Sequence, residues 1–324
     1  MPKELRSCLI LLLAAGIWGF AFVAQRVGAA YLPTFEFNGI KFCLGAVTLI
    51  PVIFVFQKKS GQPLFSAEKR GRALRNVLPR GVVLGVVLFI ASTLQQYGIT
   101  VGTTAGKAGF ITGLYTVLVP IFGMFLGRHS HVSSWVSAVI AAVGIFLISV
   151  KGNFTISYGD LFELACAVFW AVHILFADRF SKQANNLGLS FLQFAVCGLL
   201  SLFSSLLFET PTVSGIFTAI IPVLYGGLFS VGVAFTLQIV GQRSAPAAPS
   251  AIIMSMEALF AALGGFLILG ENLGVKAYIG CALMICAIIL SQYPSLKRQK
   301  VPTAQPLVQE PEKIVSVITA AEEN

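Results

Sequence analysis

Long stretches without a charged side chain constrain this chain more than any other feature of its sequence. About 20 apolar residues in a helix are enough to cross the hydrocarbon core of a bilayer. Charge-free stretches that approach or exceed this length are Gly81–Gly106, Ala108–Gly127, Val132–Val150, Gln183–Phe208, Thr210–Gln242 and Ala277–Leu296. Four more apolar stretches, at about 7–27, 34–56, 158–179 and 246–269, contain isolated ionisable residues. The sequence therefore predicts an all-α membrane protein with ten transmembrane helices.

The composition agrees with a bilayer environment. Hydrophobic residues make up 56% of the 324 residues and charged residues only 11%, which leaves too few polar side chains to cover a soluble globule of this size. The first apolar run continues through Trp18 and leads into further spans, which favours an uncleaved first helix over a secretory signal. Within Thr210–Gln242, Pro222 predicts a helix that begins or is kinked there.

The basic residues are distributed unevenly among the predicted loops. With the N-terminus in the cytoplasm, most Lys and Arg residues fall on the cytoplasmic side of ten spans, as the positive-inside rule describes. The net charge of +9 is therefore explained by membrane orientation and not by nucleic-acid binding. We expect a multi-pass protein of the cell membrane with both termini in the cytoplasm. The basic connection at 57–80 is expected to lie on the anionic leaflet as a short surface helix; the alternative is a solvated loop that only sets topology.

One apolar pattern occurs twice along the chain. Leu94-Gln95-x-x-Gly98 is matched 143 residues later by Leu237-Gln238-x-x-Gly241. Each copy contains five predicted spans, and an odd number forces the second copy to insert upside down relative to the first. We therefore expect two inverted five-helix repeats, at 1–150 and 151–293, followed by a disordered cytoplasmic tail at 294–324. Inverted repeats of this kind are the framework of carriers that expose a central site alternately to the two sides of the membrane.

A polar stripe runs along the predicted sixth helix. Glu163, Cys166, Trp170, His173 and Ala177 follow spacings of three and four residues, which places them on one helical face. A Trp face can hold an apolar or cationic part of a solute, and a carboxylate with an imidazole can serve as a proton-coupling pair. Each residue also has a structural alternative to proton coupling: the Glu163 side chain can reach the outer interface, and the His173 ring can form a hydrogen bond to a neighbouring helix.

Other polar side chains lie deep in the predicted spans, where they must face protein or a wet cavity. Glu257, near the centre of the ninth helix, either joins an interhelical hydrogen-bond network or meets a substrate cavity. Lys41 in the second helix and Lys107 at the start of the fourth either attract anionic or zwitterionic solutes or neutralise a buried acid. Gln95 and Gln238 either bond between helices or contact a solute.

Motifs of catalytic and metal centres are missing from the sequence. The Gly106-Lys107 pair lacks the surrounding phosphate-loop pattern, and neither HExxH nor GxSxG occurs. We therefore expect no cofactor and no enzymatic activity. Two alternatives stay open: an integral-membrane enzyme that uses the polar stripe, and a non-transporting scaffold or sensor that acts through its basic loop and tail.

Several short motifs together resemble the EamA-type members of the drug/metabolite transporter superfamily. They are Ile17-Trp18-Gly19, Gly39-Ile40-Lys41-Phe42, the 103–115 segment that ends at Tyr115, Phe169-Trp170-Ala171, Met256-Glu257-Ala258-Leu259-Phe260-Ala261 and Leu269-Gly270-Glu271. The resemblance covers about 5–293 and implies a ten-helix pseudo-twofold bundle with a central cavity, which moves amino acids or other small metabolites, often outward. It implies that Trp18, Trp170 and the Glu257 helix line the cavity. Many relatives have Arg where Lys41 stands and proline where Ala258 stands.

The sequence therefore predicts a carrier that exports small polar metabolites such as amino acids by alternating access, with proton coupling as a further expectation. Its expected partners are a small-molecule substrate, protons and the lipid bilayer, with anionic lipids at the 57–80 loop. The candidate binding or coupling residues are Trp18, Lys41, Gln95, Glu163, Trp170, His173, Gln238 and Glu257.

Overall fold

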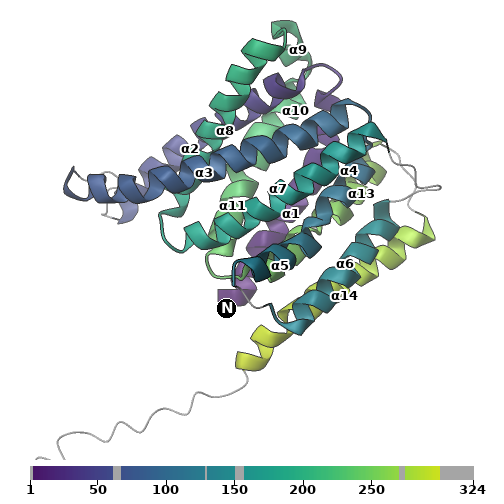
Figure 1. Ribbon diagram of the computed structural model, residues 1–324. Helices are drawn as coiled ribbons and strands as arrows, with labels where there is room; N and C mark the ends of the chain where they lie inside the picture. The colour runs from purple at the N-terminus through teal and green to yellow at the C-terminus, as the bar shows by residue number, and fades with distance from the viewer. Residues whose placement is uncertain (1–2, 61–66, 128–129, 150–156, 270–273, 300–324) are drawn as a thin grey trace, which may run out of the picture.

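The computed structural model describes residues 3–60, 67–127, 130–149, 157–269 and 274–299, and within these ranges the chain is helical without any strand. The helices are α1 (Lys3–Gly28), α2 (Thr34–Ser60), α3 (Ala67–Thr100), α4 (Ala105–Gly113), α5 (Tyr115–Phe125), α6 (Val132–Ser149), α7 (Tyr158–Ser181), α8 (Asn186–Phe208), α9 (Val213–Thr218), α10 (Ile220–Leu224), the π-helix η1 (Tyr225–Phe235), α11 (Thr236–Gln242), α12 (Ala247–Met254), α13 (Glu257–Leu269) and α14 (Val275–Gln299). Figure 1 shows them packed side by side, with α6 and α14 paired along one flank of the bundle.

Eight helical segments among the described residues are long and apolar enough to cross a membrane, judged by length and composition. Some of these segments combine consecutive short helices, such as α4 with α5 and α12 with α13. Two further apolar helices are shorter, at Val132–Ile148 and Val275–Ser291. The predicted class, a helical multi-pass membrane protein, is thus confirmed.

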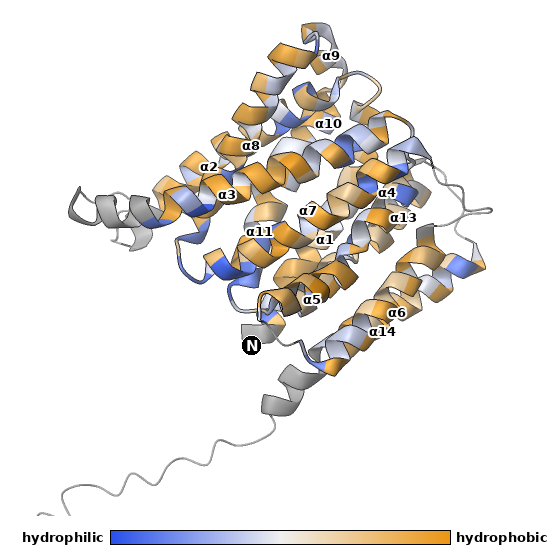
Figure 2. Cartoon of the chain, viewed as in Figure 1, coloured by the Kyte–Doolittle hydropathy of each residue, from blue (hydrophilic) through white to orange (hydrophobic). Residues whose placement is uncertain are grey.

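Apolar side chains cover the outside of the bundle and polar side chains fill part of its inside. Phe125 and Phe208 are 83% and 75% exposed, whereas Glu163, His173 and Gln193 are completely buried. Figure 2 shows hydrophobic colour along the flanks of the helices and hydrophilic colour concentrated near helix ends. This arrangement suits a surface solvated by lipid tails, because polar groups in hydrocarbon must be satisfied within the protein.

The helix ends are set by local sequence signals. Ser157 and Asp160 form a capping box that starts α7, and the Thr104 side chain accepts a hydrogen bond from the Lys107 backbone N–H at the start of α4. Gly102 and Gly127 have φ angles of 119° and 70°, which side chains with a Cβ rarely adopt, and they close the turns after α3 and α5. Asp160 and Lys107 lie in the first turns of α7 and α4, and their ion pair places these two helix starts at the same end of the bundle.

Two of the membrane-crossing segments are broken in the middle. The segment formed by α4 and α5 breaks at Leu114, whose N–H bonds the carbonyl three residues earlier instead of four. The segment formed by α12 and α13 breaks at Ser255 and Met256, and the Ser255 hydroxyl bonds the Ile252 carbonyl at 2.8 Å. Because each break interrupts the regular backbone bonding of a membrane-crossing helix, both are suited to form the wall of a binding site.

The segment that follows α8 is also irregular. The predicted start of its helix near Pro222 agrees with a span that begins at Ile220, after the short α9. The chain then forms the π-helix η1, a rare geometry that occurs often at functional sites. Glycines on η1 allow close contact with α2, because an added Cβ at Gly227 would meet the Leu44 side chain.

The predictions for the two basic segments need correction. Helix α3 already begins at Ala67 and continues without a break to Thr100, so the second part of the 57–80 connection extends a membrane-crossing helix instead of forming a separate surface helix. Residues 61–66 lie outside the described ranges. Helix α14 extends to Gln299, past the predicted start of the disordered tail at 294, and residues 300–324 are outside the described ranges.

Candidate functional site

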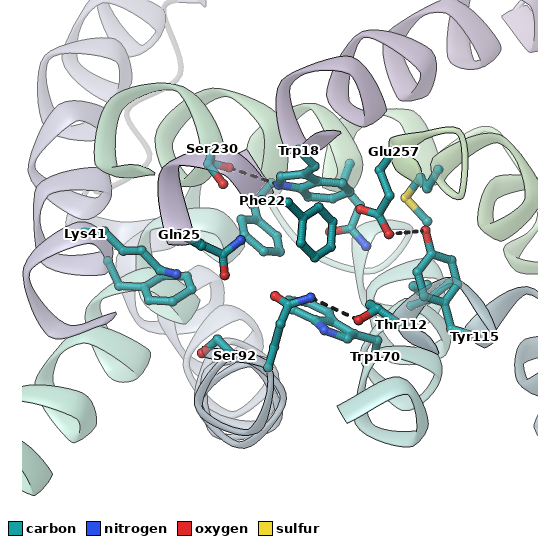
Figure 3. Close-up of a pocket in the computed structure, with 16 residues that line it drawn as sticks. Trp18, Phe22, Gln25, Lys41, Ser92, Thr112, Tyr115, Trp170, Ser230 and Glu257 are labelled. Carbon is teal, nitrogen blue, oxygen red and sulfur yellow. Dashed lines mark hydrogen bonds between the residues drawn. The ribbon is translucent and has the colours of Figure 1, made fainter. Parts of the chain in front are cut away.

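A cavity with a volume of about 50 Å³ lies between the broken helices and η1. Its wall is formed by α1, α2, α3, α7, η1 and α11 together with both broken segments; α6, α8 and α14 take no part in it. The lining residues are Trp18, Phe22, Gln25, Lys41, Phe42, Ser92, Gln95, Thr112, Tyr115, Trp170, Ile174, Ser230, Phe235, Gln238, Met254 and Glu257. Figure 3 shows the arrangement of these side chains.

Six of the eight candidate residues from the sequence line this one cavity. They are Trp18, Lys41, Gln95, Trp170, Gln238 and Glu257, which come from helices far apart in the chain. The remaining two, Glu163 and His173, are completely buried behind the wall. Four of the five residues on the predicted face of α7 are buried and Trp170 is partly buried, and α7 reaches the cavity with Trp170 and with Ile174, which was not part of the predicted face.

Aromatic rings form the middle of the cavity wall. Phe235 contacts the Trp18 ring edge-on, with centroids 4.8 Å apart, and stacks on the Trp170 ring at 5.7 Å. The Trp18 Nε1–H donates to the Ser230 carbonyl at 3.2 Å, which fixes the indole against η1. These two indoles are 152 positions apart in the sequence, and together they offer flat apolar faces to the cavity.

The Lys41 amine lies at one end of the cavity without an anionic partner among the described residues. Its side chain is 6% exposed, and within the described part of the chain its amine has neither a hydrogen bond nor an ion pair. The Nζ atom lies 5.0 Å from the Phe37 ring centroid and 5.4 Å from that of Phe42, so two aromatic faces partly replace its hydration. A buried ammonium without an anion is costly, and an anionic group in the cavity would offset that cost.

Glu257 begins α13 at the opposite end of the cavity in the view of Figure 3. Its Oε1 atom accepts a hydrogen bond from the Tyr115 hydroxyl at 3.1 Å, so the two broken segments meet at this contact. The carboxyl group is 6% exposed and has no ion pair among the described residues. Glu257 thus joins an interhelical hydrogen bond, as the first alternative expected, and it also lines the cavity.

The two repeat-related glutamines differ in their contacts. Gln95 donates from Nε2 to the Thr112 hydroxyl at 3.2 Å, whereas the Oε1 atom of Gln238 is buried without a hydrogen-bond partner. The first contact bridges α3 to α4 and still leaves Gln95 in the cavity wall. A solute donor that reaches Gln238 would satisfy its orphaned oxygen.

His173 and Lys107 have structural partners. The His173 Nε2 atom lies 2.9 Å from Gln193 Oε1 on α8, and its ring contacts Trp170 and Phe235, so it supports the cavity wall from behind. Lys107 forms an ion pair with Asp160 at 2.5 Å. For His173 the sequence left two possibilities, proton coupling or a hydrogen bond to a neighbouring helix, and the contact with Gln193 is a bond of the second kind.

Sequence reasoning left most of the remaining lining residues unassigned. Tyr115 appeared only as part of a motif, and Thr112 and Ser230 carried no signal that distinguishes them from packing residues. Their placement depends on the helix breaks and on η1, which no local pattern predicted. Among the described residues, no group of three or more His, Cys, Asp or Glu side chains is arranged to hold a metal ion.

Comparison with known proteins gives a consistent result. The EamA-like transporter family matches this chain twice, over residues 5–150 and 157–293. An uncharacterized transporter of Archaeoglobus fulgidus is 29% identical over 293 residues, which cover 89% of this chain and 86% of the relative. The uncharacterized transporter YoaV of Bacillus subtilis is 23% identical, with 87% and 95% covered. A protein solved by crystallography has the same fold, with a TM-score of 0.72 and 20% identity over 91% of this chain and 99% of that chain.

Proposed function

The chain belongs to the EamA-like transporter family, and from this premise we propose that it carries neutral amino acids, or similar small zwitterions, across the cell membrane by alternating access. The observation that supports this solute class most directly is the charge pattern of the cavity. Lys41 and Glu257, neither of which has an ion pair among the described residues, face the same enclosed space.

A zwitterion complements the polar groups at the two ends of this cavity and the aromatic groups between them. Its carboxylate can accept from the Lys41 amine, and its ammonium group can donate to Glu257, with each contact strengthened by charge. Trp18, Phe22 and Trp170 lie between these two ends in Figure 3, so an apolar side chain of the solute meets aromatic faces. A solute with only one of the two charges leaves the other protein charge buried without a partner, which disfavours its binding.

The packing of the helices supports the inverted-repeat part of the proposal. Helix α1 packs against η1 and α11 and also against α12 and α13, whereas α7 packs against α3 and also against α4 and α5. In the proposed repeats α1 corresponds to α7, α3 to η1 with α11, and the α4–α5 segment to the α12–α13 segment. The contacts of α1 and the contacts of α7 are therefore equivalent. The breaks at Leu114 and Ser255–Met256 also lie close to equivalent positions under the offset of 143 residues. Two similar bundles that enclose a central site can rock about it.

The proposal also includes the direction of transport, the orientation of the chain in the membrane and the energy source for transport. The family resemblance favours export, the uneven distribution of Lys and Arg favours both termini in the cytoplasm, and protons are the proposed coupling ion. Inverted membrane vesicles, in which export appears as uptake, test the direction of transport. An epitope tag at each terminus, probed in sealed cells, tests the orientation.

Anionic lipids are proposed to bind a groove between α3 and α7. The groove is lined by Pro79, Arg80, Val83, Phe176, Arg179, Phe180 and Gln183. Arg80 is held by the Gln183 side chain and the Asn76 carbonyl, and Arg179 is exposed without an ion pair in the described structure. Two guanidinium groups above an apolar floor suit a phospholipid with an anionic headgroup.

Binding measurements with matched ligands test the solute class. We expect L-leucine and L-phenylalanine to raise the unfolding temperature of the purified protein. Their decarboxylated amines and deaminated acids should bind at least about tenfold more weakly, because a charge-assisted hydrogen bond contributes about 1.5–3 kcal/mol. Glu257→Gln should weaken binding of the amino acid and of the amine, and leave binding of the acid unchanged.

The control is Glu36→Gln, which removes another buried acid that bonds the Thr212 backbone away from the cavity. This variant should keep the ligand preferences of the natural protein. Equal stabilisation by all three ligand types, or an equal loss of acid and amine binding in Glu257→Gln, would contradict the proposed recognition of zwitterions.

A further inference from the structure

Glu163 is a completely buried acid whose carboxylate has no cation in contact. Its Oε2 atom accepts from the Thr112 hydroxyl at 3.1 Å and from the Cys166 thiol at 3.5 Å. Its Oε1 atom is buried without a hydrogen-bond partner and lies against Gly98, where an added Cβ would come within 2.8 Å of it. A carboxyl group in such a place is retained at a cost, and packing alone does not explain it.

The other repeat shows that this helix crossing does not require an acid. Under the offset of 152 residues that relates Trp18 to Trp170, the counterpart of Glu163 is Leu11, which is also completely buried. The counterpart of Gly98 is Gly241, and an added Cβ there would meet the Leu11 side chain just as one at Gly98 would meet Glu163. A leucine therefore fills the equivalent crossing of α1 with α11, so the carboxyl group of Glu163 serves another purpose.

The polar surroundings of Glu163 differ between the repeats in the same way. Thr112 directs its hydroxyl to Glu163, whereas its counterpart Ser255 bonds the carbonyl of its own helix. Lys107 and Asp160 form an ion pair. Their counterparts are Ser250, at the offset of 143, and Cys8, at the offset of 152, and neither side chain is charged. We call the crossing of α3 with α7 the seam. It has an acid inside it and an ion pair at its end, whereas the equivalent crossing of α1 with α11 has neither.

The ionisable groups around Glu163 are few. Its own helix contributes Cys166 and, one turn toward the end of the bundle, Asp160; α4 contributes Lys107, which is bonded to Asp160. Beyond Thr112, Tyr115 of α5 and Glu257 of α13 are bonded to each other. Helix α3 faces Glu163 with Gly98 and with the neutral amide of Gln95. None of these groups supplies a cation to the Glu163 carboxylate.

Thr112 connects Glu163 to the solute cavity. Its hydroxyl donates to Glu163 and accepts from Gln95, and both Thr112 and Gln95 line the cavity. At the other end of the seam, Asp160 is held by Lys107, by Thr103 at 3.1 Å and by the Ser157 backbone at 2.7 Å. In this conformation the route to Glu163 therefore leads from the cavity, and the ion pair seals the outer end.

We propose that Glu163 is the proton-binding site that couples solute movement to the proton gradient, and that Thr112 transfers protons between it and the cavity. The inference rests on the proposed function and names the coupling group within it. A hydronium ion in the cavity gives a proton to the Thr112 oxygen while the hydroxyl proton passes to Glu163 Oε2. The hydroxyl is restored, the carboxylate becomes neutral, and water is left without its extra proton. The neutral acid fits the closed seam between α3 and α7, and ionisation favours its opening to water.

Proteoliposomes separate coupling from solute movement. Two rates are measured with tritiated L-leucine and L-phenylalanine: counterflow without a pH gradient, and transport driven by a pH gradient. For Glu163→Gln we expect counterflow within about twofold of the natural protein and at least a tenfold loss of the gradient-driven rate. Thr112→Val leaves the acid in place but alters the cavity wall, so its two rates are compared with each other: the gradient-driven rate should fall at least about tenfold more than counterflow. Glu36→Gln, the matched buried acid outside the seam, should keep both rates.

The outcomes distinguish this inference from the proposed function. Absence of counterflow in the natural protein with either amino acid argues against the solute class. Counterflow in the natural protein together with full gradient-driven transport in Glu163→Gln overturns the proton site. Loss of counterflow in a folded Glu163→Gln protein also overturns it, because the residue would then be needed for solute movement itself. If Glu163→Gln does not fold, a gradient-driven rate in Thr112→Val that falls no further than counterflow overturns the transfer route and with it the inference.

Discussion

Replacement of Lys41 by methionine should stabilise the protein and weaken solute binding at the same time. Methionine is close to lysine in length and is apolar, so it can fill the same space between Phe37 and Phe42. The ammonium group lies 5.0 and 5.4 Å from these ring centroids, contacts that contribute about 0.5–2 kcal/mol each. Burial of a charge without an anion costs several kcal/mol. The difference predicts a gain of about 1–3 kcal/mol in the solute-free Lys41→Met protein.

The same substitution removes the proposed partner of the solute carboxylate. Loss of a charge-assisted hydrogen bond of about 1.5–3 kcal/mol weakens binding roughly 10- to 100-fold. Thermal unfolding in detergent measures the first effect, which corresponds to an increase of roughly 2–4 °C per kcal/mol. Calorimetric titration with L-leucine and L-phenylalanine measures the second.

Lys107→Met is the matched control, because that amine is paired with Asp160 at 2.5 Å. Its removal leaves a buried carboxylate without its cation, so the unfolding temperature should fall instead of rise. A Lys41→Met protein that is less stable than the natural one and binds both amino acids with unchanged affinity would refute the reasoning. Lys41 would then be a packing residue whose charge is satisfied in the solute-free state.

Two further predictions concern packing and lipid. Gly98→Ala should lower the unfolding free energy by about 1–3 kcal/mol, because its Cβ would lie 2.8 Å from Glu163 Oε1 and 2.9 Å from the Gly159 carbonyl oxygen. Gly109→Ala is the control and should be neutral, because its Cβ would have no neighbour nearer than 3.9 Å. Equal unfolding temperatures for the two variants would contradict this account. Arg179→Gln should reduce the extra stability that phosphatidylglycerol gives over phosphatidylcholine by about 1 kcal/mol, measured by thermal unfolding in mixed micelles, and an unchanged lipid preference would remove Arg179 from the groove.

The sequence predicted the polar residues of the interior better than their contacts. Burial of Glu163, His173 and Glu257 follows from the cost of polar groups in hydrocarbon, whatever the details of packing. Their partners depend on how α7 is rotated and crossed by its neighbours. His173 is turned toward Gln193 of α8, Glu163 toward Thr112 of α4 and Trp170 toward the cavity, so one helical face serves three different environments.

Membrane class, the positions of the apolar segments and the repeat were determined by the sequence alone, because hydropathy over about 20 residues and similarity at a fixed offset are local properties. The shared cavity was decided by the tertiary structure. Lys41 and Glu257 are 216 positions apart, and they face one cavity because the helices of both halves interleave around it. The breaks at Leu114 and Ser255 and the π-helix η1 also required the fold, since no proline marks either break and packing determines where the backbone departs from regular geometry.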